Sequence, residues 1–121
     1  MAIAFLNGTK HIPTAIAPSA AGIRGEDLKA YQCPNPLPVM IMHSSQDRLF
    51  PGYGNEAIQW WAACNGCDVI PTAKDVDGCV TYRGCRNNVT TRYCEGLGAH
   101  TKWPGNNKAI IDFFRSNQQV R

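Results

Sequence analysis

Residues 37–43 (LPVMIMH) form an almost unbroken apolar run with turn-forming residues on both sides. Such a run is typical of a parallel β-strand covered on both faces, whereas a strand with one solvent-facing side alternates apolar and polar residues. Proline cannot donate a ladder hydrogen bond, so Pro38 fits only near the start of this strand. Together with the helical patterns that follow it, the run predicts an α/β layer.

The rest of the chain alternates between strand, loop and helix patterns. Ile110, Phe113 and Phe114 share one helical face, and Asn55 is a candidate N-cap before a broad apolar helix face that Gly66 ends. The predicted elements are a helix tail over 1–6, a strand over 11–17, a loop over 18–36, a helix over 56–65, hairpin strands over 80–83 and 90–94, and a helix over 108–116. We interpret all 121 residues as one domain.

Six cysteines in this short chain predict disulfides and an oxidising compartment. The sequence alone does not choose their partners. Cys64 and Cys67 have the C-x-x-C spacing of a metal site, but no second C-x-x-C or H-x-x-x-H follows, so we expect no metal. We expect an extracellular protein, although residues 1–6 are too short for the core of a secretory signal. The natural protein is therefore expected to begin upstream of Met1.

Charge and hydrophobicity exclude several other classes. The net charge of +3 is spread along the chain and forms no dense basic stripe, which argues against nucleic acid as a partner. No apolar run is long enough to cross a membrane. A charged fraction of 17% and a hydrophobic fraction of 44% are typical of a globular protein.

Two loops carry residues with catalytic chemistry. Asp47 follows the strand over 37–43 directly, and His100 lies in a glycine-bearing loop after the strand over 90–94. If the two strands are neighbours in one parallel sheet, both side chains emerge at the same sheet edge, where α/β proteins place their catalysts. A carboxylate that accepts from one imidazole nitrogen fixes the tautomer and stabilises the protonated ring.

Each of these residues also has a simpler interpretation. Asp47 could be a turn residue whose carboxylate bonds backbone amides, and His100 could be a surface histidine. The context of the two strands favours an acid–base pair over both. We interpret His11 and His43 as non-catalytic; His43, which closes the apolar strand, is expected to be packed or hydrogen-bonded.

Five segments together resemble the polyhydroxybutyrate depolymerase-like family of secreted carboxylic ester hydrolases, which includes feruloyl and acetylxylan esterases. The resemblance runs from about Ile12 to Phe114 and its motifs occur in the family's order. The segments are LPVMIMHSSQDRLFPGYG, WWAACNGCDVIPT, TYRGC, GLGAHTKWPG and AIIDFF. They resemble, in turn, the strand with its His-Gly-x-x-Asp loop, the helix that ends in Asn-Gly-Cys, the segment with that cysteine's partner, the histidine loop and the closing helix.

The resemblance implies the C-terminal half of an α/β-hydrolase sheet with flanking helices and a disulfide-stapled hairpin. Asp47 would be the acid of the catalytic triad and His100 its general base, and Trp103 would lie near the acyl or aromatic pocket. Cys67 and Cys85 would form a disulfide, while the pairing of Cys33, Cys64, Cys79 and Cys94 stays open and Cys33 could lack a partner in this chain. The substrate would be a polyester or a plant cell-wall ester, with no cofactor.

The chain departs from the family in three ways. Ser44 stands where the family has glycine, and Ala99 and Lys102 add residues around the histidine. The largest departure is that no G-x-S-x-G nucleophile elbow is present, so the serine and the oxyanion hole are missing and we expect the chain alone to be inactive.

Two alternatives remain. One is a non-catalytic half-hydrolase that binds a partner or self-associates through an exposed sheet edge and an uncovered apolar face. The other is an unrelated disulfide-stapled module, in which Asp47 and His100 would lie far apart.

Overall fold

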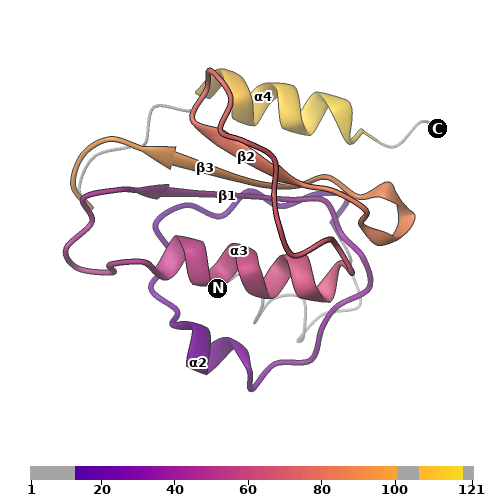
Figure 1. The fold of residues 1–121 in the computed structure, drawn as a ribbon, viewed down its shortest axis with the longest axis horizontal. Helices are drawn as coiled ribbons and strands as arrows, with labels where there is room; N and C mark the ends of the chain where they lie inside the picture. Colours follow the sequence, from indigo (N-terminus) through magenta and orange to yellow (C-terminus); the bar gives the residue numbers. More distant parts are fainter. Residues whose placement is uncertain (1–12, 101–106, 119–121) are drawn as a thin grey trace.

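The computed structural model describes residues 13–100 and 107–118, which form a small mixed α/β unit (Figure 1). Its three-stranded sheet has the order β1-β3-β2, with β1 and β3 parallel and β2 antiparallel to β3. The elements are α2 (Gly25–Leu28), β1 (Val39–Ser44), α3 (Tyr53–Cys64), β2 (Cys79–Tyr82), the short 3₁₀ helix η1 (Arg86–Asn88), β3 (Thr91–Gly96) and α4 (Asn107–Ser116).

The apolar strand β1 is covered on both faces, as its composition predicts. Successive side chains of a strand point to opposite faces, so β1 feeds two separate cores. Val39 and Ile41 belong to the core cluster that contains Trp61 of α3. Met40 and Met42 belong to the cluster that contains Phe113 of α4. Helices α3 and α4 therefore lie on opposite sides of the sheet, and the expected uncovered apolar face is not found in the described part of the chain (Figure 1).

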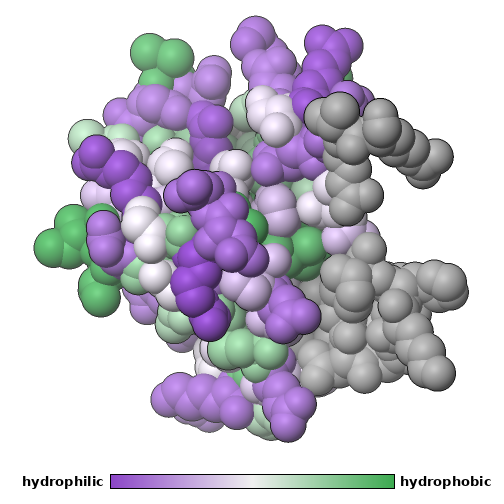
Figure 2. All heavy atoms as spheres, turned by 90° about the vertical axis from the view of Figure 1, so that its right-hand side faces the viewer, coloured by the Kyte–Doolittle hydropathy of each residue, from purple (hydrophilic) through white to green (hydrophobic). Residues whose placement is uncertain are grey.

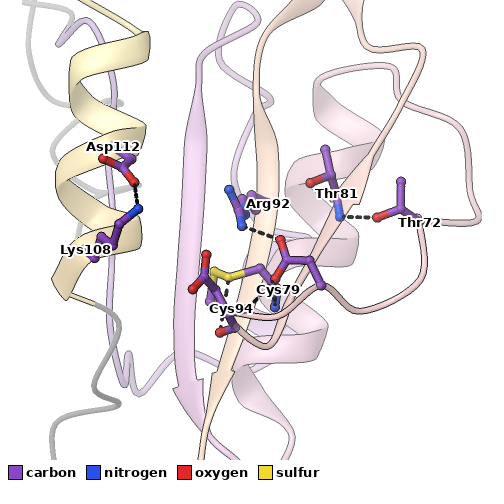
Figure 3. Close-up of polar contacts among 9 residues, drawn as sticks. Thr72, Cys79, Thr81, Arg92, Cys94, Lys108 and Asp112 are labelled. Atoms are coloured by element: carbon purple, nitrogen blue, oxygen red, sulfur yellow. Dashed lines mark hydrogen bonds and ion pairs between the residues drawn. A yellow bond between two sulfur atoms is a disulfide. The ribbon is translucent and has the colours of Figure 1, made fainter.

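The outer edges of β1 and β2 both carry neighbouring segments. An extended segment bridges β1 in parallel at Ile16 and Ser19, and the Met40 N–H donates to the Ile16 carbonyl at 3.1 Å. Beside β2, the Thr72 N–H donates to the Thr81 carbonyl at 2.8 Å, and the Thr81 N–H donates to the Thr72 hydroxyl at 2.9 Å (Figure 3).

Three disulfides tie the elements together, and all six cysteines are bonded. Cys33 pairs with Cys64, so the expectation that Cys33 could lack a partner in this chain is wrong. Cys67 pairs with Cys85, as the family resemblance implies, and Cys79 pairs with Cys94 across β2 and β3 (Figure 3). Three disulfides indicate folding in an oxidising, extracellular type of environment. None of the described helices has the length and apolar character needed to cross a membrane.

Several predicted boundaries need correction. The segment over 18–36, predicted as loop, contains α2, because the fully buried Leu28 anchors a single helical turn against α3. The predicted strand over 11–17 is present only as the isolated bridge at Ile16, and its first two residues lie outside the described ranges. The N-cap of α3 is Gly52 rather than Asn55, since Gly52 supplies the left-handed backbone (φ 73°) that starts the helix. The predicted helix tail over 1–6 lies outside the described residues.

Candidate active site

Asp47 is held in a tight turn directly after β1. One carboxylate oxygen, Oδ1, accepts the backbone N–H of Leu49 at 3.0 Å and that of Phe50 at 2.8 Å. This is the local side-chain-to-backbone pattern of an aspartate turn, so the simpler interpretation of Asp47 accounts for the hydrogen bonds of Oδ1. The side chain is only 1% exposed. The turn therefore presents the second oxygen, Oδ2, in a fixed direction.

The histidine loop is joined to the aspartate loop by backbone hydrogen bonds. Ser44 of β1 is in register with Gly96 of β3, where both strands end. Beyond that point the Ser45 N–H donates to the Gly96 carbonyl at 2.7 Å, and the Gln46 N–H donates to the Gly98 carbonyl at 3.1 Å. Gly98 has a φ of 122°, a left-handed conformation that favours glycine and turns the chain towards His100.

The two loops bring the imidazole of His100 onto the carboxylate of Asp47. His100 Nδ1 lies 2.7 Å from Asp47 Oδ2, a charge-assisted hydrogen-bond distance. The ring is 28% exposed, and the ring of Phe50 packs edge-on against it with centroids 4.8 Å apart. His100 is thus oriented on one side by the carboxylate and on another by an aromatic ring, while part of it stays accessible.

The hydrogen bonds around Asp47 keep the carboxylate charged. Burial exerts the largest single influence and raises the pKa, because it disfavours the ionised form. The backbone N–H of Phe50, the hydrogen bond and charge of His100, and the charge of His43 act in the opposite direction. Their combined effect is larger, so the pKa of Asp47 lies below its ordinary value. A buried carboxylate of this kind can stabilise a protonated imidazole.

His43 is a second imidazole beside the same carboxylate oxygen. Its Nε2 lies 2.8 Å from the Phe50 carbonyl oxygen and 3.4 Å from Asp47 Oδ2, and its side chain is 3% exposed. It is packed and hydrogen-bonded, as expected from its place at the end of an apolar strand. The spacing of four residues between His43 and Asp47 was the only sequence signal for this contact, and it is too common to predict one.

Gly54 in the first turn of α3 fits tightly against His43. A Cβ atom added to Gly54 would lie 2.3 Å from the Cβ of His43 and 3.1 Å from the ring of Tyr93. We expect Gly54→Ala to lower the free energy of unfolding by about 1 to 3 kcal/mol, although alanine is the better helix former. Urea denaturation measures the change. Gly25→Ala in α2 is the matched control, because its new Cβ would meet only the Glu56 side chain at 3.3 Å; equal effects of both variants would contradict the prediction.

The other residues that the sequence analysis considered for a site lie away from the Asp47–His100 pair or outside the described residues. Trp103 and His11 lie outside the described residues, so the expected position of Trp103 near an acyl or aromatic pocket stays a prediction. Cys67 and Cys85 lie beside Thr91 at the start of β3, at the other end of the strand from the Asp47 loop. Among residues 13–100 and 107–118, no group of three or more His, Cys, Asp and Glu side chains is arranged to hold a metal ion.

We found no protein-family model and no curated protein that matches this chain. The family resemblance therefore depends on the five sequence segments alone. The geometry of Asp47 and His100 is independent of that resemblance, because it follows from the hydrogen bonds that join the two loops.

Proposed function

We propose that this chain is the C-terminal part of a secreted serine-type carboxylic ester hydrolase of the polyhydroxybutyrate depolymerase, feruloyl esterase or acetylxylan esterase type. Asp47 is the acid and His100 the general base of its triad, and the sheet is the second half of an α/β-hydrolase sheet. The observation that carries the proposal is the 2.7 Å contact between His100 Nδ1 and Asp47 Oδ2, made from loops that follow two neighbouring parallel strands. Acid before histidine is the chain order of α/β-hydrolases.

In this mechanism His100 first accepts a proton from the serine and then donates it to the leaving alcohol. With Nδ1 donating to Asp47, the other ring nitrogen, Nε2, removes the proton from a serine hydroxyl as its oxygen attacks the ester carbonyl. The charge of the resulting imidazolium is stabilised by the buried carboxylate of Asp47. Nε2 then delivers the proton to the alcohol oxygen as the C–O bond breaks, and water repeats the cycle on the acyl-enzyme. The serine and the oxyanion hole come from a segment outside these 121 residues, which contain no G-x-S-x-G.

The inactivity of the chain alone is the first test. With a short p-nitrophenyl ester as substrate, we expect the purified chain to give the same turnover as its His100→Ala variant, at the level of buffer. The reason is that a base without its nucleophile and oxyanion hole does not supply the main catalytic terms. Turnover above buffer that His100→Ala removes would contradict this part of the proposal.

The activity itself is tested in a longer gene product. An in-frame G-x-S-x-G encoded upstream of the Met1 codon would supply the missing nucleophile. In that longer protein we expect His100→Ala to lower kcat by a factor of about ten thousand, because loss of one triad member disables the set. Lys108→Ala, which removes an exposed ion pair with Asp112 on α4, is the control and should leave kcat unchanged. Esterase activity that is insensitive to His100→Ala would overturn the proposal.

A self-associating, non-catalytic domain is the second candidate. Leu49 and Leu97, on the two loops that hold Asp47 and His100, are 62% and 86% exposed. The face of the molecule drawn in Figure 2 is mostly hydrophilic with a few groups of apolar residues. Val69 and Ile70, adjacent in the chain after α3, are also 89% and 81% exposed, so the exposed apolar surface extends beyond the two loops. Size-exclusion chromatography that gives a single monomer at high concentration would count against this candidate.

A further inference from the structure

His43 has a hydrogen-bonding environment that fixes the position of its ring proton. Its Nε2 faces two acceptors, the carbonyl oxygen of Phe50 at 2.8 Å and the carboxylate oxygen Oδ2 of Asp47 at 3.4 Å. Neither group can donate, so Nε2 carries a proton whatever the charge of the ring. The other nitrogen, Nδ1, is buried and has no hydrogen-bond partner among the described residues. The polar contacts of the His43 ring in the described part of the chain are therefore with the aspartate turn, at Phe50 and Asp47.

The shorter of the two polar contacts of His43 is with the carbonyl oxygen of Phe50. Phe50 in turn contacts both Asp47 and His100. The Phe50 N–H donates to Asp47 Oδ1 at 2.8 Å, and its ring packs edge-on against His100. A Cβ atom added to Gly22 would lie 2.7 Å from the Cζ atom of Phe50, so the ring also packs closely against the backbone of Gly22. Fixing the Phe50 carbonyl thus fixes a residue that holds the acid through its N–H and the base through its ring.

We propose that His43 is a positioning residue that holds Asp47 in place for His100, by donating its Nε2 proton to the Phe50 carbonyl and, at longer range, to Asp47 Oδ2. The proposal rests on the proposed function, since it assigns a role in the same acid–base pair. Loss of the Nε2 donor frees the Phe50 carbonyl and lets the carboxylate turn away from His100. An error of about one ångström at such a site is enough to lower the rate about a hundredfold.

The experiment uses the full 121-residue chain and observes the proton between His100 and Asp47. In nuclear magnetic resonance spectra of the nitrogen-15-labelled chain, the His100 Nδ1 proton is expected at low field and protected from exchange with water. Two matched variants have side chains of similar length: His43→Gln keeps an N–H donor near the position of Nε2, and His43→Met does not. We expect exchange of the His100 proton to be about tenfold faster in His43→Met and within about threefold of the original rate in His43→Gln.

A purely structural role for His43 predicts a different pattern. It would change the melting temperature of both variants but would leave the exchange rate equal in the two, once each is measured well below its melting temperature. Equal exchange in His43→Met and His43→Gln therefore overturns the positioning role. A third variant, Asp47→Asn, tests the pair itself: if the low-field proton of His100 persists in Asp47→Asn, the proposed function fails. If that proton is lost in Asp47→Asn but unchanged in His43→Met, only the positioning proposal fails.

A measurement on the unsubstituted chain covers the case in which a variant does not fold. The nitrogen-15 chemical shifts of the His43 ring report which nitrogen carries the proton. We expect a protonated Nε2 that exchanges slowly with water and is linked to the Phe50 carbonyl. A bare Nε2, or one that exchanges as fast as a solvent-exposed imidazole, would overturn the proposal without any substitution.

Discussion

Asn65→Ala is expected to lower the free energy of unfolding by about 4 kcal/mol, because it removes a buried side chain that holds three hydrogen bonds. Asn65 is fully buried at the end of α3. Its Oδ1 accepts the Leu37 N–H at 3.1 Å, and its Nδ2 donates to the Leu37 carbonyl at 3.0 Å and to the Thr91 hydroxyl at 2.9 Å. Alanine leaves two backbone groups without partners in a buried site, and each costs about 1 to 3 kcal/mol.

Urea denaturation with all three disulfides intact measures this effect. Asn55→Ala is the matched control, because Asn55 is an exposed asparagine in the first turns of the same helix. We expect its effect to be within about 0.5 kcal/mol of zero. If Asn65→Ala unfolds at the same urea concentration as Asn55→Ala, the side chain does not join the end of α3 to the starts of β1 and β3 as described.

The sequence predicts those parts of the fold that depend on local patterns of apolar and turn-forming residues. The apolar run that forms β1 predicts that both faces of the strand are covered. This is confirmed, because Val39 lies in the core on one face of the sheet and Met40 in the core on the other. The loops that carry Asp47 and His100 follow strands that do pair in parallel, so their convergence depends on a pairing that strand patterns favour but do not fix. The catalytic role of the two residues stays a prediction.

Contacts between distant segments could not be predicted from the sequence. Cys33 pairs with Cys64 because the loop with α2 folds back on α3, where Leu28 joins the core and Ile23 and Tyr31 pack against it. In the Asn-Gly-Cys segment the family resemblance gives a role to Cys67 alone, yet Asn65 in the same segment makes three buried hydrogen bonds. The contacts of His43 with Phe50 and Asp47 depend on the path of the turn between them, which the sequence does not specify.

Asp47→Asn is expected to lower the free energy of unfolding at neutral pH by about 2 to 3 kcal/mol. The asparagine can still accept the N–H groups of Leu49 and Phe50 through one oxygen. Its NH₂ group then replaces Oδ2 and meets the protons on His43 Nε2 and His100 Nδ1, so two acceptor contacts become donor–donor contacts. Because the lost partner is a buried carboxylate, the penalty exceeds that of an exposed ion pair.

The difference in free energy of unfolding between the original chain and Asp47→Asn depends on pH, because the pKa of Asp47 is lowered. A carboxyl group whose folded pKa lies below its unfolded value of about 3.9 contributes its full stability above pH 5 and loses it as the pH falls through the folded pKa. Protonation in the unfolded state precedes protonation in the folded state, so acid favours unfolding. The original chain should therefore lose stability more steeply below about pH 5 than Asp47→Asn does, and the gap between the two should shrink.

Urea denaturation at a series of pH values, from neutral pH down to the lowest pH at which both proteins still fold, tests whether the difference in stability shrinks in acid. The pKa of Asp75 is also lowered, by the amides of Cys79 and Asp77 and by Arg92 against the opposing effect of burial, but Asp75 is present in both proteins and cancels in the difference. Asp112→Asn is the control: the pKa of Asp112 is lowered by Lys108, yet its side chain is 51% exposed and water screens the pair. Acid profiles of Asp47→Asn and of the original chain that run parallel would mean that Asp47 is not the buried, charged partner that His100 and His43 surround.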